Sequence, residues 1–312
     1  MKEGAKITRR CILCDADNYE IIFTYTYDYL AKVRRHPTEW LEEIGWSEDT
    51  ISSVVRCTNC GAKYVRDVFH NFETGYTELS EQKVINAWNN YDSYKKFDRT
   101  EYKIGVLYNV ISLAINDLSR NIRLLDYGAG SGTWCNMARA FGVKDVFAYD
   151  PHHPYHPEFY KLYNFPGIVA SRSWEEMQNY GPFDAVICNA VFEHLVNPRE
   201  DISRIYDNMT KGGYFYINNP FMNLDKEINS LKNAKKIEKK MAISHYHPGH
   251  VNYLTPGEFR LFLSNFGFKT IRVGANPLIP PGNLKRFIRG KIGSLCIYTG
   301  IYKPSRVILK KV

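Results

Sequence analysis

Residues 124–133 read LLDYGAGSGT, an apolar run that leads into glycines at every second position and then into a segment expected to be helical. Glycine lets the backbone adopt positive φ at Gly128, Gly130 and Gly132, and it lets a ligand approach the main chain closely. The stretch therefore predicts a strand, a glycine-rich turn and a helix, with a nucleotide-like ligand over the turn.

Two acidic residues distinguish this turn from that of dinucleotide-binding proteins. Asp126 precedes the glycines, and Asp150 ends the next apolar run about 20 residues later, where its carboxylate can accept both hydroxyls of a ribose. A dinucleotide fingerprint needs a glycine where Thr133 stands, and it usually has an apolar residue in place of Asp126. The acids therefore favour a nucleoside cofactor of another kind.

At these residues the chain resembles the class I S-adenosylmethionine-dependent methyltransferases, whose loop reads D-x-G-x-G-x-G. Residues 183–195 (FDAVICNAVFEHL) and 212–215 (GGYF) resemble the family's fourth strand and the glycine pair before its fifth, so the resemblance covers about residues 91–273. It implies S-adenosyl-L-methionine as cofactor, with Asp126 ordering the methionine amino group. The other residues that it implies at the cofactor are Gly128, Ala129, Gly130, Gly132 and Asp150, with Ser173 and Trp174 near the adenine, and Asn189 and Val191 after the fourth strand.

Apolar runs alternate with amphipathic segments from residue 122 onward, which is the pattern of a parallel sheet flanked by helices. We expect strands at 122–127, 145–149, 167–170, 183–188, 214–217 and 268–273, and helices at 133–141, 157–163, 173–180, 198–209 and 255–266. Thr255 is the expected N-cap of the last helix, because Pro256 then occupies its first turn. The predicted fold class is α/β, a Rossmann-like seven-stranded methyltransferase sheet with a small N-terminal zinc-binding module.

The sequence divides into four expected zones, which are a zinc-binding module at 1–70, a helical connector at 71–121, the Rossmann-like methyltransferase domain at 122–275 and a basic C-terminal tail at 276–312. Apolar residues of the connector recur at helical spacing, and they include Val106, Leu107, Val110, Leu113 and Ala114. A Lys-rich helix at 225–242 belongs to an insertion at about 219–254. In the tail, residues 284–292 have the pattern of an amphipathic basic helix.

Seven cysteines include two C-x-x-C pairs, Cys11 with Cys14 and Cys57 with Cys60. Four thiolates on two such knuckles suit a tetrahedral Zn²⁺, and Gly61 permits the tight turn after the last ligand. Four protein ligands leave no open coordination position, so the zinc is expected to be structural and to support a lid or a substrate wall. The remaining cysteines are expected to pack as small apolar residues, namely Cys135, Cys188 and Cys296.

The formal net charge of +8 is unevenly distributed, because residues 276–312 hold basic side chains and no acid. This asymmetry favours an anionic partner, and it leaves open a diphosphate-bearing substrate, a nucleic acid or a membrane surface contacted by the tail. A zinc module ahead of the methyltransferase domain resembles the layout of deoxysugar methyltransferases and related enzymes of surface-polysaccharide or antibiotic-sugar pathways. The resemblance implies a small-molecule acceptor, a sugar or sugar nucleotide.

Histidine is the expected proton acceptor, because a methyl sulfonium is already activated and the protein mainly positions a nucleophile and removes its proton. His194 follows the fourth strand, and His245, His247 and His250 precede the helix at 255–266, again at the carboxyl edge of the sheet. We expect His250 or His247 to be the base in preference to His245 or His194, since family members often carry a histidine where His250 stands. Hydrogen-bonded structural histidines and a three-histidine metal site are the alternatives.

Other protein classes fit the sequence less well. Hydrophobic residues make up 44% and charged residues 24%, which excludes a disordered or fibrous chain. No apolar run approaches the roughly 18 residues of a membrane span, and the first residues lack the apolar core of a secretion signal, so we expect a cytoplasmic protein. An rRNA or tRNA methyltransferase is the main alternative, although the place of an Asn/Asp-Pro-Pro-aromatic motif holds NAVF at 189–192. A non-catalytic cofactor-binding scaffold is another.

Overall fold

The computed structural model describes residues 6–28, 31, 42, 46–69, 100–118, 121–130, 132–151, 167–218, 250–273 and 306–312. The contacts within the chain divide it into two units. The sheet unit comprises residues 81–191, 202–219 and 263–312, and the cysteine unit comprises residues 1–80, 192–201 and 220–262. Residues 250–254, the described end of the expected insertion, therefore group with the N-terminal residues.

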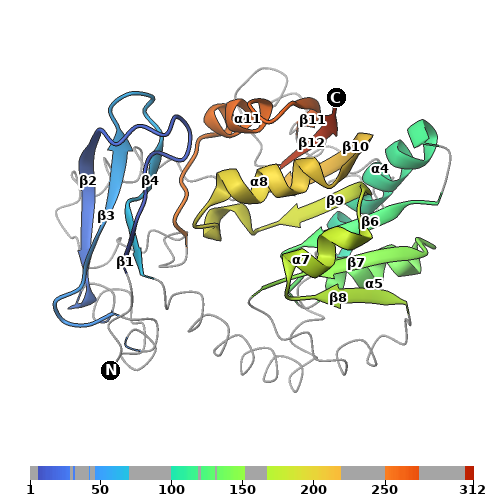
Figure 1. The fold of residues 1–312 in the computed structure, drawn as a ribbon, viewed down its shortest axis with the longest axis horizontal. Coiled ribbons are helices and arrows are strands. Elements are labelled where there is room, and N and C mark those ends of the chain that lie inside the picture. Colours follow the sequence, from blue (N-terminus) through green and yellow to red (C-terminus); the bar gives the residue numbers. More distant parts are fainter. Residues whose placement is uncertain are drawn as a thin grey trace, which may run out of the picture. The chain divides into compact units, whose positions relative to one another are not determined.

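A seven-stranded sheet in the order β11-β12-β10-β9-β6-β7-β8 forms the sheet unit (Figure 1). Its strands are β6 (Arg123–Tyr127), β7 (Asp145–Tyr149), β8 (Ile168–Ser171), β9 (Phe183–Asn189), β10 (Met209–Asn218), β11 (Phe268–Val273) and β12 (Arg306–Lys311). The neighbours from β10 through β8 pair in parallel, and β12 is antiparallel to both β10 and β11. The predicted Rossmann-like seven-stranded sheet is confirmed.

Strand β12 lies in the segment that the sequence analysis assigned to a basic tail. Its apolar residues Val307, Ile308 and Leu309 are buried, and its lysines are used for local contacts. Lys310 pairs with Asp117, and the Lys311 ammonium donates to the carbonyl oxygens of Tyr206 and Met209 at 2.6 and 2.9 Å. The high basic content of the tail concealed this strand. The amphipathic helix expected at 284–292 lies outside the described residues.

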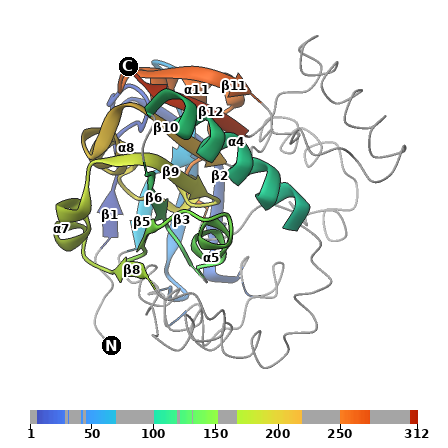
Figure 2. The same ribbon diagram turned by 90° about the vertical axis from the view of Figure 1, so that its right-hand side faces the viewer.

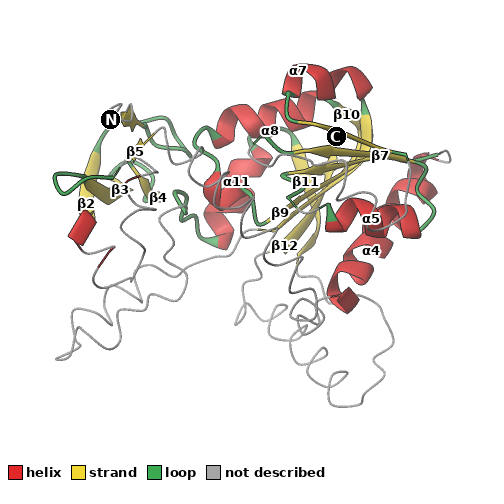
Figure 3. Ribbon diagram, turned by 90° about the horizontal axis from the view of Figure 1, so that it is seen from below, coloured by secondary structure: helices red, strands yellow, loops and turns green. Residues whose placement is uncertain are grey.

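Helices cover both faces of the sheet, with α4 (Thr100–Leu118) and α5 (Thr133–Ala140) on one face and α7 (Trp174–Met177) on the other, as Figures 2 and 3 show. The apolar residues expected along the connector belong to α4, where Val106, Leu107, Val110 and Ala114 are buried in the core of the sheet unit. The turn η2 (Gln178–Tyr180) continues from α7. The helices expected at 157–163 and 225–242 lie outside the described residues. None of the described helices is both long and apolar enough to cross a membrane.

Two further helices, α8 (Pro198–Asp207) and α11 (Pro256–Ser264), contain residues of both units. The predicted N-cap of α11 is confirmed by a reciprocal pair of hydrogen bonds. Glu258 N–H donates to Thr255 Oγ1 at 3.4 Å, and Thr255 N–H donates to Glu258 Oε2 at 2.6 Å. This is the capping box that the Thr-Pro-x-Glu start predicts.

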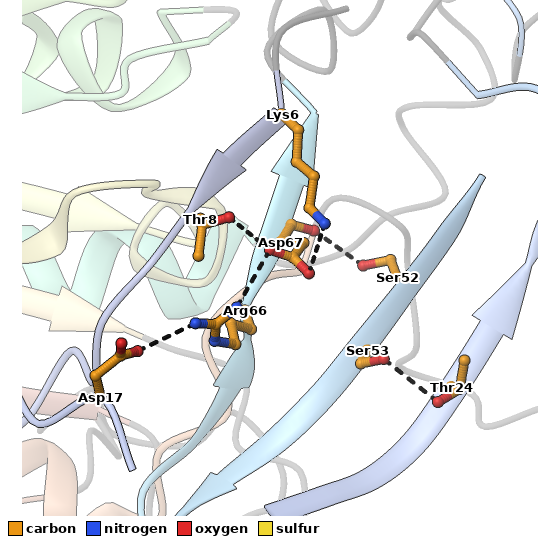
Figure 4. Close-up of polar contacts among 8 residues, drawn as sticks. All are labelled: Lys6, Thr8, Asp17, Thr24, Ser52, Ser53, Arg66 and Asp67. Carbon is orange, nitrogen blue, oxygen red and sulfur yellow. Dashed lines mark hydrogen bonds and ion pairs between the residues drawn. The ribbon is translucent and has the colours of Figure 1, made fainter. Parts of the chain in front are cut away.

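The cysteine unit contains a three-stranded antiparallel sheet of β2 (Tyr19–Thr26), β3 (Ile51–Cys57) and β4 (Lys63–Val65). A second ribbon pairs β1 (Lys6–Thr8) with β5 (Asp67–Phe69). Figure 4 shows polar contacts that join these strands around Asp67. The Asp67 carboxylate accepts from Thr8 Oγ1 at 2.8 Å and lies 3.1 Å from the Lys6 ammonium, while Ser52 Oγ of β3 donates to the Asp67 carbonyl at 2.9 Å. The ribbon is thereby tied to the sheet.

Candidate functional site

The glycine loop after β6 is held mainly by backbone hydrogen bonds to β7. Gly128 N–H and Ala129 N–H both donate to the carbonyl oxygen of Tyr149, at 2.7 and 3.0 Å. The φ angles of Gly128, Gly130 and Gly132 are +75°, +51° and +69°, a region that favours glycine. Gly132 directly precedes α5, so the predicted strand, turn and helix are all present.

Two of these glycines differ in what surrounds them. A Cβ atom on Gly128 would lie 2.3 Å from Cγ2 of Val191, so the loop packs against the segment that follows β9. A Cβ atom on Gly130 would have no described atom within 4 Å. The loop is thus closely packed at Gly128 and open at Gly130, and the open side leaves room for a ligand beside the main chain.

Asp150 joins the end of β7 to this loop. One carboxylate oxygen, Oδ2, accepts a hydrogen bond from Gly130 N–H at 2.8 Å, and the side chain is buried. The acid expected to bind a ribose therefore also determines the course of the loop. Its proximity to the open position at Gly130 is what a ligand-binding role requires.

Asp126 is almost completely buried, with 1% of its surface exposed. The thiol of Cys135, in the first turns of α5, donates to Asp126 Oδ2 at 3.5 Å. Burial, together with the adjacent Asp126 carboxylate, raises the pKa of the Cys135 thiol well above its usual value. Cys135 is therefore a neutral buried donor, as expected of a packing cysteine, and it helps to fix the carboxylate that leads the loop.

Ser173 and Trp174 have local structural roles at the start of α7. Ser173 Oγ accepts from Glu176 N–H at 3.2 Å and is the N-cap of the helix. The buried Trp174 ring contacts Tyr127 and Tyr149, with ring centroids 5.6 and 5.3 Å apart. These tyrosines end β6 and β7, so Trp174 packs beside the two strands that carry the loop acids. Contact of either residue with an adenine stays a prediction.

Asn189 and Val191 follow the same edge of the sheet at the end of β9. Asn218 Nδ2, at the end of β10, donates to Asn189 Oδ1 at 3.2 Å, and Ala190 N–H donates to the Asn218 carbonyl at 3.0 Å. Ala190 has φ of +58°, which is uncommon for a residue with a side chain. The chain therefore turns sharply between Asn189 and Val191. The sequence analysis gave Asn218 no role, because its place next to Asn189 depends on the register of β10 against β9.

Two of the four predicted histidines, His194 and His250, come together in the cysteine unit. Their ring centroids are 4.8 Å apart in an edge-to-face arrangement, and His194 Nε2 lies 4.0 Å from Glu193 Oε1. His194 and Glu193 belong to the short turn η3 (Phe192–His194). His245 and His247 lie outside the described residues, so their proximity to this cluster stays a prediction.

Glu193 is the third member of this cluster, and the sequence analysis assigned it no role. Its side chain is buried, Oε2 has no hydrogen-bond partner among the described residues, and burial raises the pKa of the carboxyl to about 8. A buried carboxyl with a raised pKa beside two histidines is characteristic of a site that handles protons. The adjacent Glu-His pair in FEHL was the only signal in the sequence.

The spacing of this cluster can be compared with that of a metal site. Within the described residues, the ligand atoms of Glu193, His194 and His250 lie within 4.8 Å of one another. Ligands about 2.1 Å from a shared ion lie roughly 3.0–3.4 Å apart, which is closer than the 4.0 Å between His194 Nε2 and Glu193 Oε1. The arrangement is therefore wider than that of a preformed metal site.

The four predicted cysteine ligands form a tighter cluster. Cys11 Sγ and Cys60 Sγ are 3.5 Å apart, and Cys14 Sγ and Cys57 Sγ are 3.6 Å apart. Each knuckle is followed by a residue with positive φ, Asp15 at +61° and Gly61 at +81°. The turn expected at Gly61 is therefore present, and the first knuckle uses an aspartate in the same conformation.

Comparisons with known proteins agree with the site in the sheet unit. The family model described as "Methyltransferase domain" matches residues 96–273. No curated protein matches the chain.

Several solved structures are similar to this chain. They include the plantazolicin methyltransferase BpumL in complex with SAH (15% identity, 76% of this chain and 93% of that chain, TM-score 0.47), the 1,6-didemethyltoxoflavin-N1-methyltransferase of Burkholderia thailandensis (16%, 75% and 87%, 0.46) and a SAM dependent methyltransferase from Archaeoglobus fulgidus (19%, 70% and 99%, 0.38). The family model spans more than half of the chain and includes the whole glycine loop and both of its acids. The chain therefore belongs to the methyltransferase domain family and is a class I S-adenosylmethionine-dependent methyltransferase.

Proposed function

We propose that this methyltransferase acts in the cytoplasm on a small-molecule acceptor, a sugar or sugar nucleotide of polysaccharide or natural-product biosynthesis. The observation that carries the transferase function is the glycine loop, which is open beside Gly130 and tied to Asp150. The sugar acceptor is supported by the layout of the chain, in which four clustered cysteines precede the methyltransferase domain. The basic residues between 276 and 312 suit a diphosphate on the acceptor.

The sheet unit binds and orients the cofactor, which supplies an activated methyl group. In this proposal Asp150 accepts the ribose hydroxyls beside Gly130, and Asp126 orders the methionine amino group through the loop. The remaining contacts come from the rest of the glycine loop and from two flanking segments, namely Gly128, Ala129 and Gly132, then Asn189 and Val191, and then Ser173 and Trp174. The burial of both acids supports this, because a carboxylate out of water binds hydroxyl and ammonium donors more strongly than an exposed one.

The cysteine unit holds a structural zinc ion in this proposal, with Cys11, Cys14, Cys57 and Cys60 as ligands. Zn–S bonds of about 2.3 Å place neighbouring sulfurs of a tetrahedral site about 3.8 Å apart, and the observed Sγ distances of 3.5 and 3.6 Å are close to that value. Four thiolates leave no coordination position for substrate. The ion would therefore stabilise the unit and take no part in methyl transfer.

We assign the removal of the proton from the acceptor to the histidine cluster. His250 is the first candidate for the base, and His194 lies beside it. When bound, S-adenosylmethionine would supply an activated methyl group to the acceptor atom, and the imidazole would take up the acceptor proton. The cluster follows the cofactor segment closely along the chain, because Glu193 is only two residues after Val191. His247 and His245 are retained as further candidates.

Methyl transfer by the full chain to a panel of sugar nucleotides and their keto forms tests this proposal. We expect S-adenosylhomocysteine to form with at least one panel member. We expect His250→Gln to lower kcat about 100-fold or more, the usual share of a general base, while calorimetry finds the affinity for S-adenosylhomocysteine unchanged. The matched variant His245→Gln should have a smaller effect.

Three results would contradict the proposal in different ways. Methylation of RNA but of no panel member, with a steep dependence of RNA binding on salt, would indicate the rRNA or tRNA enzyme. Cofactor binding without turnover of any acceptor would indicate a scaffold. Equal activity of His250→Gln and the wild type would remove His250 from the mechanism and leave the transferase function intact.

A further inference from the structure

The backbone that follows His250 extends the small sheet of the cysteine unit. Val65 N–H donates to the Val251 carbonyl at 2.9 Å, and Tyr253 N–H donates to the Lys63 carbonyl at 3.0 Å. Asn252 forms an antiparallel bridge with Tyr64 between these two bonds. Residues 251–253 therefore add to the free edge of β4, although nearly two hundred positions separate them in the sequence.

The same segment also holds the turn that contains Glu193. Val251 N–H donates to the Glu193 carbonyl at 2.7 Å, and Asn252 N–H approaches the same oxygen at 3.3 Å. The Asn252 side chain is buried, and its Nδ2 donates to the carbonyl oxygens of Phe192 and Leu195 at 2.7 and 2.8 Å. Asn252 thus bonds to the turn on both sides of the Glu193–His194 pair.

Arg9 joins these contacts to the first cysteine knuckle. Its side chain is 5% exposed, and one guanidinium nitrogen donates to the carbonyl oxygens of Val65 and Val251, both at 3.1 Å. The other terminal nitrogen donates to Asn252 Oδ1 at 2.5 Å. Cys11 is only two residues further along the chain. A buried guanidinium is expensive unless its donors are used, so these bonds hold all three segments together.

The orientation of the Asn252 amide depends on Arg9. An amide has one acceptor side and one donor side, and the cation fixes the oxygen toward itself. The nitrogen must then face the Phe192 and Leu195 carbonyls, which is the orientation that holds η3. A reversed amide would set its NH₂ group against a guanidinium and its oxygen against two carbonyl oxygens, so both sides would repel.

We infer that Arg9 and Asn252 are positioning residues, through which the cysteine unit sets the relative placement of Glu193, His194 and His250. The inference rests on the proposed function only in giving this cluster a role in proton transfer. Asn252 bonds to the turn that carries Glu193 and His194, and Arg9 bonds to Val251 and Asn252, which directly follow His250. The two residues thus control the 4.0 Å and 4.8 Å separations within the cluster.

The test uses the full chain, labelled with ¹³C at the histidine rings, together with amide hydrogen exchange. The His194 and His250 signals are assigned with His194→Gln and His250→Gln. Arg9→Met and Asn252→Asp should both shift these two signals, because each ring lies within the magnetic field of the other. Exchange at Val251 N–H should rise about tenfold or more. Arg10→Met, at the neighbouring and exposed arginine that bonds to Asp15, is the matched control and should change neither readout.

The two variants separate positioning from general destabilisation. Asn252→Asp keeps an acceptor for Arg9 and loses both donors to η3, so exchange should rise at Val251 while Val65 and Tyr253 remain protected. Arg9→Met should raise exchange at all three amides. Affinity for S-adenosylhomocysteine should stay within about twofold of the wild type in both, since its residues belong to the sheet unit.

Unshifted histidine signals and unchanged exchange at Val251 in Asn252→Asp would overturn the inference, whether or not Arg9→Met folds. This outcome is independent of catalysis. A second outcome separates the two roles. If neither His250→Gln nor His194→Gln lowers methyl transfer, but Asn252→Asp shows the expected shifts, the proton-transfer role is refuted and the positioning role stands.

Discussion

The glycine loop and the histidine cluster are built in contrasting ways. In the loop, backbone groups of neighbouring strands bond to one another, and Gly128, Ala129 and Gly130 donate to two consecutive residues of the chain, Tyr149 and Asp150. In the cluster, the turn that carries Glu193 accepts backbone hydrogen bonds from Val251 and Asn252 and is also held by the side chain of Asn252, which bonds in turn to the side chain of Arg9. We therefore expect the loop to be sensitive to an added methyl group, and the cluster to be sensitive to the loss of a side chain that is distant in the sequence.

The largest effect is expected at the cysteines. Cys57→Ser should reduce bound zinc from about one equivalent per chain to none, and should unfold the cysteine unit, because structural zinc sites contribute their binding free energy to folding. Zinc content measured by a colorimetric chelator, with circular dichroism of the same sample, checks this. Cys188→Ser, at a buried cysteine of the sheet unit, is the control and should keep its zinc. Full retention of zinc by Cys57→Ser would show that Cys57 is not a zinc ligand and would contradict the proposed metal site.

The next effect is expected at Gly128. An alanine there brings its Cβ atom 2.3 Å from Val191 and must also adopt φ of +75°. We expect the affinity for S-adenosylhomocysteine to fall about 100-fold, because overpacking costs about 1–3 kcal/mol and left-handed strain about 1–2 kcal/mol. Isothermal titration calorimetry measures this directly.

Gly142 supplies a matched control for the strain alone. Its φ is +89°, and an added Cβ atom would meet nothing within 4 Å among the described residues. Gly142→Ala should therefore lower stability by about 1 kcal/mol and leave cofactor affinity unchanged. Equal loss of affinity in both variants would show that strain, and not the contact with Val191, governs the loop. The double variant Gly128→Ala with Val191→Ala should recover part of the affinity.

A smaller effect is expected from pH. Burial raises the pKa of Glu193 to about 8 from an ordinary value of 4.5, so between these values the folded chain holds a proton that the unfolded chain has released. This stabilisation is complete below about pH 4.5 and is lost as the pH rises through 8. Relative to Glu193→Gln, the wild type should lose about 2 kcal/mol of unfolding free energy between about pH 5 and about pH 6.5.

Urea denaturation of both proteins at the two pH values measures this difference. Parallel pH dependence in the two proteins would contradict a buried, protonated Glu193.

The smallest effect is expected at two helix caps, one in each unit. Ser173→Ala removes the acceptor for Glu176 N–H, and Thr255→Ala removes the acceptor for Glu258 N–H. Each should cost about 1 kcal/mol of stability. Differential scanning calorimetry measures both. Ser173→Ala should also leave cofactor affinity nearly unchanged if the hydroxyl acts only as a cap, and a clear loss of affinity would favour the predicted contact near the adenine.

The sheet and its glycine loop could be predicted from the sequence because the residues that indicate them lie close together along the chain. Asp126, the three alternating glycines and Asp150 lie within one β-α-β unit, and each glycine stands where the backbone has positive φ. The strand boundaries agree with the structure to within a few residues for β6 to β9, whereas β10 begins earlier than expected. Strand β12 was missed because lysines and an arginine flank its three buried apolar residues, and charge suggested a solvated tail.

The histidine cluster could be predicted from the sequence only in part. The sequence pointed to His194 and His250 separately, and the Glu-His pair suggested nothing about Glu193 without its burial. Arg9 and Asn252 carried no signal at all, because their bond joins positions that are 243 residues apart. The two cysteine pairs were visible in the sequence, because each has the short C-x-x-C spacing typical of a metal knuckle.

Strand β4 and Arg9 are synthesised early, whereas residues 251–253, which pair with β4 and include the residues that bond to Arg9, are synthesised much later. Residues 251–253 are synthesised only after β6 to β10 of the other unit, a delay on the order of ten seconds at ordinary elongation rates. During that interval Val65 N–H and Lys63 C=O at the edge of β4 lack the partners that residues 251–253 provide, and Arg9 lacks two of the three acceptors that the described residues give it. A fragment that ends at residue 80 remains permanently in this incomplete state, so the cysteine unit cannot be excised or exchanged as an N-terminal cassette.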